Sequence, residues 1–526
     1  MRAWSSGGHW RSVRTGDNAS MVGLVCVLFL SAPGVSLTVD ASKDRHAISP
    51  YIYGTNAPDW KGRGRYLTLA RQGGNRMTAY NWENNASNAG NDWHNQNDDF
   101  LGGGDVPGQV VRSFLEPTLA AGAAAVVTVP MAGYVAADEK GDGDVANTPN
   151  YLETRFVKTS VHKPGPYTYP PDTKDHTVYE DEFVWWVEKT FKPKDKIFFD
   201  LDNEPDIWSG THSRIWTRKP TYAEFLARSI DYAKMIKRLA PEGLVFGPVS
   251  YGWNGFVSFQ DAPDANGRFF LGYYLAQMHS ASEEAGKRLL DVLDVHWYPE
   301  AQGGGKRITE DSAAPAMVAA RLQAPRSLWD PTYTEDSWIT KSSTHGPIDL
   351  LPRLQKLIDE NYPGTKMSIT EYNYGGGHDI SGGLAEADVL GIYGRYGLFA
   401  AALWPLSNGE PYIDGGFDVF RDYDGNGGHF GDESVEATTS DAAQVSIYAS
   451  QDSGSRGRTV LVVINKADSA MPVSIRLSHV RGSAAKCYVL QAGSSRPQAA
   501  ADAAIRGGVC STTLPAMSAT TMVIGG

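Results

Sequence analysis

Two glutamates, Glu204 and Glu371, each close a short apolar, β-prone run. The first run is Phe198–Leu201 and the second is Ser368–Thr370. Residues that end strands follow each glutamate: Pro205 in one case, a run of glycines in the other. A carboxylate at the C-terminal tip of a barrel strand lies at the face where such barrels carry their chemistry. Two of them predict the paired carboxylates of glycoside hydrolysis, although strand-end salt bridges are the alternative.

Apolar β-like runs alternate with helix-like segments over residues 49–435, which predicts an α/β fold, a (β/α)8 TIM-like barrel. The clearest helix opens at Thr221, where Thr221 and Glu224 have capping-box spacing, and it stops at Pro241. On this pattern Glu204 follows strand four and Glu371 follows strand seven. The eight candidate strands are Tyr51–Asn56, Arg71–Tyr80, Ala124–Val129, Lys196–Asp202, Leu244–Val249, Val292–Trp297, Met367–Thr370 and Phe399–Trp404.

The pattern changes towards the C-terminus. Residues 436–526 read as short alternating strands between Ser/Gly-rich turns, which predicts a smaller β-sandwich, and a strand within 37–48 is expected to join it. Cys487 and Cys510 both fall in this part. In a secreted chain such a pair predicts a disulfide. Two unpaired buried thiols remain the alternative, because sequence does not give their separation.

The N-terminal residues 1–36 have the layout of a secretory signal. Arginines precede the apolar run Met21–Leu30, and small residues follow it. The run is too short to span a membrane, so we expect a secreted, extracellular chain with no membrane contact in its mature form.

Composition narrows the function classes further. The 526 residues carry a net charge of −12, which leaves no basic patch for nucleic acid. The chain has 14 Trp and 25 Tyr. Core packing accounts for some of these rings, and an open cleft that stacks on sugar faces would use others. We expect a monomer that binds a polysaccharide.

Taken together, the motifs resemble glycoside hydrolase family 44, the endo-β-1,4-glucanases and xyloglucanases of a large clan of retaining barrel hydrolases. The similarity extends from about residue 37 nearly to the C-terminus. An Asn-Glu-Pro tripeptide alone is only moderately specific, but the combination is highly specific. The matching motifs are Ile52–Asn56, Gly73–Arg76, Tyr80–Asn85, Leu201–Trp208, Asp294–Glu300, Thr370–Gly377 and Leu403–Pro405.

The resemblance implies a role for each glutamate. Glu204 matches the family's acid/base and Glu371 matches its nucleophile. A retaining glycosidase needs one protonated carboxyl to donate to the leaving oxygen and one carboxylate to attack C1, with the two groups roughly 5–5.5 Å apart.

Neighbouring residues have plausible tasks in that chemistry. Asn203 is expected to bind the sugar 2-hydroxyl and Tyr298 to donate its hydroxyl to Glu371. His296 points to the same face as Tyr298, and we expect a structural or supporting role for it rather than proton transfer. Trp404 looks like the platform under the sugar at the cleavage point.

Three further tryptophans, Trp82, Trp329 and Trp338, fall in predicted loops. Similar loop tryptophans of the family line outer subsites, so we predict that role for them. Core packing is the alternative, since a large amphipathic ring serves either purpose.

The stretch Asp422–Gly427, together with Glu433, fits the calcium-loop string of an EF-hand. The segment before it, Phe417–Phe420, reads as β-like, and no helix is predicted after it. A glycine-rich β-turn therefore explains most of the match, and a structural calcium ion is the second interpretation. No cofactor is expected to be required.

The predicted function is a retaining endo-β-1,4-glucanase that cleaves internal bonds of xyloglucan, carboxymethylcellulose or a related β-glucan by double displacement. An exo-acting, arabinofuranosidase-like barrel is the alternative within enzymes. A glucan-binding protein without catalysis is the alternative outside them.

Overall fold

The computed structural model describes residues 35–191 and 196–525. The predicted secretory signal therefore lies almost entirely outside the described residues. Among the helices that are described, none is both long and apolar enough to cross a bilayer.

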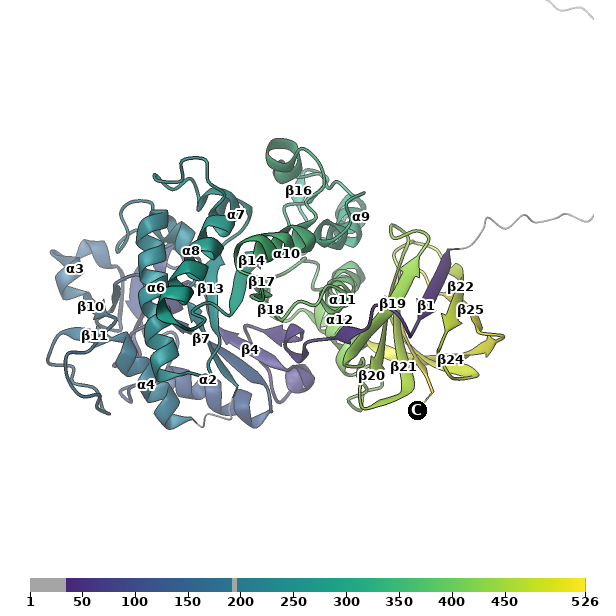
Figure 1. The fold of residues 1–526 in the computed structure, drawn as a ribbon, viewed down its shortest axis with the longest axis horizontal. Coiled ribbons are helices and arrows are strands. Elements are labelled where there is room, and N and C mark those ends of the chain that lie inside the picture. Colours follow the sequence, from purple (N-terminus) through teal and green to yellow (C-terminus); the bar gives the residue numbers. More distant parts are fainter. Residues whose placement is uncertain (1–34, 192–195, 526) are drawn as a thin grey trace, which may run out of the picture. The chain divides into compact units, whose positions relative to one another are not determined.

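Eight parallel strands close a barrel in the spatial order β12-β13-β14-β17-β18-β3-β4-β7 (Figure 1). This confirms the predicted barrel. Glu204 follows the fourth strand in chain order, and Glu371 lies within the seventh. The strands are β3 (Gly54–Thr55), β4 (Leu69–Gln72), β7 (Ala124–Val129), β12 (Ile197–Leu201), β13 (Val245–Ser250), β14 (Val292–Trp297), β17 (Lys366–Tyr372) and β18 (Ala400–Leu403).

The second predicted strand, Arg71–Tyr80, is wrong over most of its length. β4 ends at Gln72, and the short helix α1 (Asn75–Thr78) follows. Gly74 has φ of 87°, a left-handed conformation that glycine adopts without steric penalty. This turn breaks the strand and directs the chain across the C-terminal end of the barrel.

Helices cover the outside of the barrel, and the capping box at Thr221 is confirmed at the start of α6. The helices of nine or more residues are α2 (Gln109–Ala120), α4 (Glu180–Thr190), α6 (Tyr222–Leu239), α8 (Phe270–Ala285), α9 (Pro315–Gln323), α10 (Leu350–Asn361), α11 (Ile380–Arg395) and α12 (Pro411–Arg421). Shorter ones are α3 (Tyr151–Thr154), α5 (Trp208–Thr211) and α7 (Trp253–Ser258).

The N-terminal end of the barrel is filled by apolar side chains from the starts of its strands. Phe198, Phe246 and Phe399 pack there with Leu69 and Val126. Polar side chains are consequently displaced towards the opposite, C-terminal end, where both glutamates lie.

The loops of the barrel contain three small sheets. They consist of β5 (Ser87–Asn88), β6 (Gln96–Asp98) and β9 (Lys140–Asp144); β8 (Tyr134–Ala136), β10 (Phe156–Ser160) and β11 (Thr177–Tyr179); and β15 (Gln302–Gly303) and β16 (Lys306–Arg307).

The remaining strands form a second, all-β domain. The N-terminal strand β1 (Ser36–Asp40) pairs with β22 in parallel and with β19 in antiparallel orientation, so the first and last parts of the described chain share one sheet system. The other strands are β2 (His46–Ala47), β19 (Glu433–Thr439), β20 (Val445–Asp452), β21 (Ser455–Asn465), β22 (Met471–Ser478), β23 (Ala484–Gln491), β24 (Ser494–Arg506), β25 (Val509–Leu514) and β26 (Ser518–Ile524).

The predicted disulfide is wrong. Cys487 and Cys510 are both buried free thiols in the apolar core of this domain. They lie on β23 and β25, which do not pair with each other.

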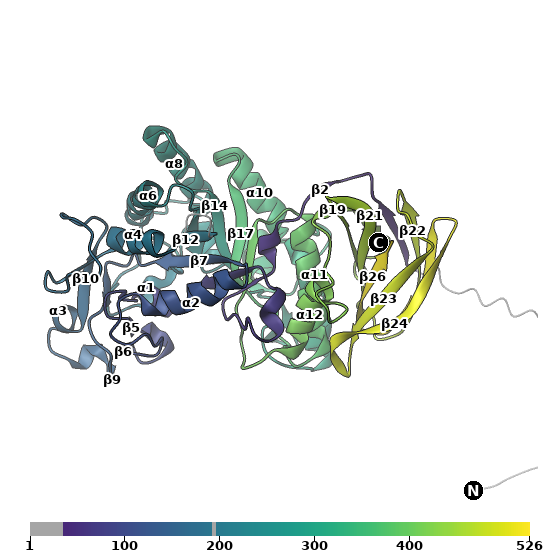
Figure 2. The same ribbon diagram turned by 90° about the horizontal axis from the view of Figure 1, so that it is seen from below.

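Helices α11 and α12 connect the two domains (Figure 2). Both contact strands of the β-domain, and every residue of α11 from Ile380 to Gly394 is buried. Lys466 of the β-domain forms a buried ion pair with Asp388 of α11 at 2.7 Å. The β-domain thus covers a face of the barrel that would otherwise be exposed and apolar.

Candidate active site

Glu204 and Glu371 lie at the C-terminal end of the barrel on strands that are not neighbours. Glu371 is part of β17, whereas Glu204 follows β12 and precedes a single 3-10 turn, Pro205–Ile207. Glu204 has φ of 46°, and its amide donates to the Val249 carbonyl at 3.0 Å. Val249 itself has φ of 59°, which is rare for a β-branched residue. Such strain is typical of functional sites, where the surrounding fold holds it in place.

The two carboxyl groups are close together. One oxygen of Glu204 and one of Glu371 lie within 4.8 Å of each other. His296, from the end of β14, lies between them, with Nδ1 at 2.8 Å from Glu204 Oε1 and 3.5 Å from Glu371 Oε2. Within the described ranges these three residues are the only group spaced to hold a metal ion. Both carboxylates already have protein partners, so the arrangement fits a carboxyl pair better than a metal site.

Glu371 has two partners that favour its charged form. Arg71 Nη1 donates to Oε1 at 2.8 Å, and the Tyr298 hydroxyl donates to Oε2 at 2.9 Å. The Tyr298 contact is the one expected from sequence. Burial raises the pKa of Glu371 above its ordinary value, and the Arg71 guanidinium and the Tyr298 hydroxyl offset part of that rise.

Glu204 is held in an environment that favours its proton. Burial raises the pKa of Glu204 well above its ordinary value, and the charges of Glu371 and Asp206 raise it further. Burial also lowers the pKa of His296 far below its usual range, so the ring is neutral. The tautomer with its proton on Nδ1 can donate to Glu204 Oε1, which leaves Oε2 free to carry the acid proton.

A buried polar layer supports both glutamates. Arg71 connects the two strands, because Nε donates to Asp200 at 2.8 Å and Nη2 donates to Asn203 Oδ1 at 2.9 Å. Asn203 also accepts from the Gly74 amide at 3.1 Å, so its side chain is fixed beside the cleft. Sequence reasoning missed Arg71 and Asp200. The available signal for Arg71 was a charged residue within the short, otherwise buried strand β4.

A cleft of about 530 Å³ opens above the carboxyl pair. It includes five of the eight site residues predicted from sequence: Asn203, Glu204, Tyr298, Glu371 and Trp404. The other residues that line it were missed, because they lie in loops and short helices whose course depends on the tertiary fold. These are Gly74, Asn75, Asn91, Asp92, Ile207, Gly210, Thr211 and Tyr251.

Trp404 lies against the glycine turn after β4. A Cβ atom on Gly74 would be 2.5 Å from the Trp404 ring, so only glycine lets the indole approach this closely. The ring is partly exposed and lines the cleft beside Glu371. Its position fits the predicted platform beneath a sugar.

The other predicted tryptophans do not line this cleft. The structure contradicts the outer-subsite prediction for Trp82, which is 1% exposed and stacks on Trp186 at 5.8 Å in the barrel core. Its loop folds inward because Phe183 and Trp186 of α4 offer an apolar face there. Trp329 and Trp338 are partly buried and pack against the same core, so a subsite role for them stays a prediction.

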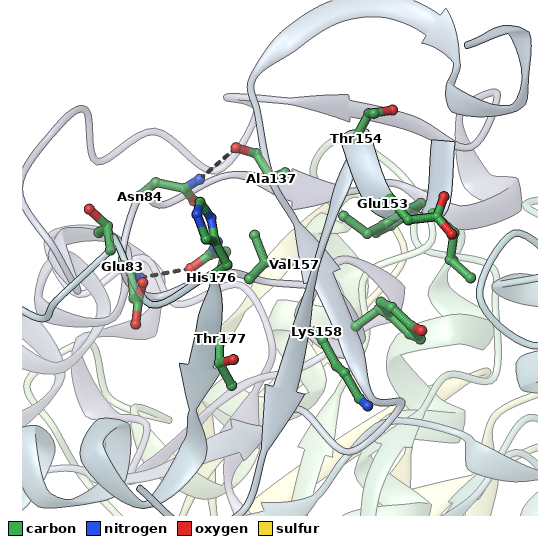
Figure 3. A pocket seen from close by; sticks show the side chains of 14 residues that line it. Glu83, Asn84, Ala137, Glu153, Thr154, Val157, Lys158, His176 and Thr177 are labelled. Carbon is green, nitrogen blue, oxygen red and sulfur yellow. Dashed lines mark hydrogen bonds between the residues drawn. The ribbon is translucent and has the colours of Figure 1, made fainter. Parts of the chain in front are cut away.

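A second cavity, of about 710 Å³, lies among the loops around β8, β10 and β11 (Figure 3). Glu83 is its buried acidic group, and burial together with Asp175 and Glu182 raises the pKa of Glu83 to about 8. Neither Glu204 nor Glu371 lines this cavity. The smaller cleft with two converging carboxyl groups is therefore the better candidate for catalysis.

The calcium-like loop has protein partners for its carboxylates. Asp422 pairs with Arg65 and accepts from the Gly427 amide, and Glu433 pairs with Arg45. The segment Phe417–Phe420, expected to be β-like, belongs to helix α12. The prediction failed because the helix is stabilised by packing against the β-domain. A calcium ion here stays a prediction.

The chain forms a closed (β/α)8 barrel, and its cleft contains two carboxyl groups whose surroundings favour a protonated and an ionised form. This combination is typical of a barrel glycoside hydrolase. Comparison with known proteins identifies the family. The sequence model of glycoside hydrolase family 44 matches residues 86–301. This chain belongs to glycoside hydrolase family 44.

Several similar proteins carry the name endoglucanase or xyloglucanase. Endoglucanase A of Paenibacillus lautus is 45% identical over 83% of this chain and 64% of its own length. A beta-mannanase/endoglucanase A of Caldicellulosiruptor saccharolyticus is 41% identical over 84% of this chain and 35% of its own length. This chain therefore spans less than two thirds of these curated relatives. A family 44 xyloglucanase of Paenibacillus polymyxa, solved with xyloglucan, is 42% identical with a TM-score of 0.88, covering 94% of this chain and 99% of that one.

Proposed function

We propose that the protein is a secreted, retaining endo-β-1,4-glucanase that hydrolyses internal bonds of xyloglucan or a related β-1,4-glucan. The separation of the two carboxyl groups is the observation that carries the proposal. Oxygens within 4.8 Å of each other fit the roughly 5–5.5 Å of retaining glycosidases and leave too little room for the water of an inverting one.

In the first step Glu371 is the nucleophile and Glu204 is the acid. Glu371 attacks the anomeric carbon while the C1–O bond breaks, and Glu204 transfers its proton to the departing oxygen. A covalent glycosyl-enzyme and the shortened glucan result. Arg71 and Tyr298 keep Glu371 ionised before attack, and Trp404 supports the reacting ring.

In the second step Glu204, now a carboxylate, takes a proton from water as that water attacks C1. The bond to Glu371 breaks, and Glu204 regains its proton. Two inversions give retention. His296 stays neutral throughout and orients Glu204 by hydrogen bonding.

The glucan substrate is supported by the relatives, which carry the names endoglucanase and xyloglucanase. Internal cleavage is supported by the name endoglucanase that these relatives carry. An exo-acting arabinofuranosidase remains the second candidate, and loss of viscosity relative to reducing ends released distinguishes the two.

The variant Glu371→Gln tests the mechanism. We expect a loss of several orders of magnitude in kcat with an unchanged melting temperature, because Glu371 supplies the bond to C1 in this mechanism. Azide should restore turnover of Glu371→Ala with an α-glycosyl azide as product. Near wild-type activity of Glu371→Gln would refute the proposal, and an initial α-configured product from the wild type would refute retention.

A further inference from the structure

Tyr251 is the cleft residue whose position the proposed mechanism does not explain. It follows β13, lines the catalytic cleft and is 37% exposed, unlike most aromatic rings of this barrel. In the barrel β13 is the direct neighbour of β12, which carries Glu204. Trp404 follows β18, the direct neighbour of the strand that carries Glu371. The two aromatic side chains are therefore associated with different catalytic groups.

A buried carboxyl group holds Tyr251 next to Glu204. Asp206, two residues after Glu204, is 1% exposed and accepts a hydrogen bond from the Tyr251 amide at 3.0 Å. Gln260 donates to its other oxygen at 3.4 Å. A Cβ atom on Gly255 would lie 2.2 Å from that oxygen, so helix α7 approaches the carboxyl group closely. The loop after β13 is thus tied to the turn that carries the acid.

The direction of bond cleavage assigns a task to this arrangement. In the proposed mechanism, the sugar that becomes bonded to Glu371 lies over that residue and Trp404. The oxygen that receives the Glu204 proton belongs to the next sugar, which must lie beyond Glu204. Tyr251, which follows the strand next to that of Glu204, and Ile207, in the turn after Glu204, both line the cleft. An exposed tyrosine ring offers an apolar face to the C–H face of a pyranose at small entropic cost.

We propose that Tyr251 forms the binding surface for the glucosyl residue on the leaving-group side of the cleaved bond, and that Asp206 is its positioning residue. The inference rests on the proposed function. Tyr251 then contacts the departing group when that group is a sugar. It makes no such contact when the departing group is a single atom.

Two substrates separate these cases: cellohexaose and β-cellotriosyl fluoride. They share the sugars that lie over Glu371, but fluoride presents nothing to Tyr251. For Tyr251→Ala we expect kcat/KM to fall roughly 10-fold on cellohexaose, in line with the loss of a half-buried ring contact. On the fluoride it should stay within about twofold of wild type. Tyr251→Phe keeps the ring and should keep most of the activity on both.

Equal losses on both substrates, or no loss on either, would overturn the assignment. Tyr169→Ala is the matched control, because Tyr169 is 41% exposed and does not line the cleft. It should leave both rates unchanged. A wild type inactive on both substrates would refute the proposed function itself, a different result from any Tyr251 outcome.

Asp206 is tested by two variants of different kinds. Asp206→Ala removes the tether and should reproduce the selective loss on cellohexaose. Asp206→Asn retains an acceptor for the Tyr251 amide and should restore the activity on cellohexaose. If Asp206→Ala does not fold, Gly255→Ala displaces the carboxyl group instead and should give the same selective loss. Equal effects of these variants on both substrates would exclude a positioning role.

Discussion

Glu204 and Glu371 are the same residue type, but their partners favour different charge states. Glu371 has a cation and a hydroxyl donor, whereas Glu204 has a neutral imidazole and two nearby acids. Because like charges in one site separate the two titrations, Glu204 keeps its proton at a pH where Glu371 has lost its own. The difference lies entirely in the surroundings.

A bell-shaped pH dependence follows from these directions. Activity should fall on the acidic side as Glu371 gains a proton, and on the alkaline side as Glu204 loses its proton. The raised pKa of Glu204 moves the alkaline limb upward from the range of a free glutamate. In Glu204→Gln the alkaline limb should disappear on substrates with good leaving groups. A retained alkaline limb would show that Glu204 is not the acid.

Glu204→Gln should also change the preference for leaving groups. Glycosyl fluorides need little protonation, so their glycosylation step should be spared, while glucan hydrolysis should fall by about 10²–10⁴-fold. Comparison of kcat/KM on both substrates measures the effect. Equal losses would argue that Glu204 has another role.

Trp404→Ala should lose roughly 10- to 150-fold in kcat/KM, which corresponds to the 1.5–3 kcal/mol gained when a large apolar side chain is buried. Part of the loss should appear in kcat, since the ring supports the reacting sugar. Steady-state kinetics and thermal unfolding are measured together. A lower melting temperature with unchanged kcat/KM would place Trp404 in the core rather than in the site.

At the level of elements, the loop after β18 depends on a buried clamp. Asn373, directly after β17, donates to the Trp404 carbonyl at 2.9 Å and to Glu410 Oε2 at 3.1 Å. Glu410 in turn accepts from the Leu406 amide at 3.1 Å. The clamp joins the strand that carries Glu371 to the loop that carries Trp404.

Replacement of Asn373 should therefore displace Trp404 rather than alter the carboxyl pair. We expect Asn373→Ala to give the kinetic pattern of Trp404→Ala at smaller amplitude, about 3- to 30-fold, since the lost bonds leave buried groups unpaired at about 1–3 kcal/mol. The double variant Asn373→Ala/Trp404→Ala checks this. Fully additive losses would mean that the clamp does not act through Trp404.

At the level of the whole molecule, the β-domain is part of the folding unit of the barrel. The side chains of Lys466 and Asp388 are each 2% exposed, and the Tyr448 hydroxyl donates to the same carboxylate at 2.6 Å. Lys466→Met should lower the free energy of unfolding by about 3–5 kcal/mol, because it leaves a buried charge without its partner. Adding Asp388→Asn should recover part of the loss. Denaturant unfolding measures both, and additive losses would contradict the coupling.

Glu386 on α11 should make stability depend on pH. Burial raises the pKa of Glu386 to about 8 from 4.5. The folded state then holds a proton that the unfolded chain releases above about pH 4.5, so stability falls as pH rises towards 8. Glu386→Gln keeps an acceptor for the Tyr372 hydroxyl and removes the titration. The stability of this variant relative to wild type should grow between about pH 5 and 8, by up to about 1.4 kcal/mol per pH unit. Parallel stability curves would exclude this role.

Local sequence determined the strands and their ends. Alternating apolar runs and strand-ending Pro205 and Gly375 were enough to place both glutamates at the correct end of a barrel, because these signals act over a few residues. The same local reasoning gave Tyr298 and Trp404, which directly follow barrel strands.

Tertiary structure decided what depends on distant partners. The partners of Glu371 include Arg71, which is 300 positions away in the chain, and the burial of Trp82 depends on the face of α4. The cysteines are buried free thiols on β23 and β25, two strands that do not pair with each other. Sequence gives the period of a strand but not which strands become neighbours. The pKa values, the cleft walls and the state of the thiols all follow from that neighbourhood, so only the folded chain determines them.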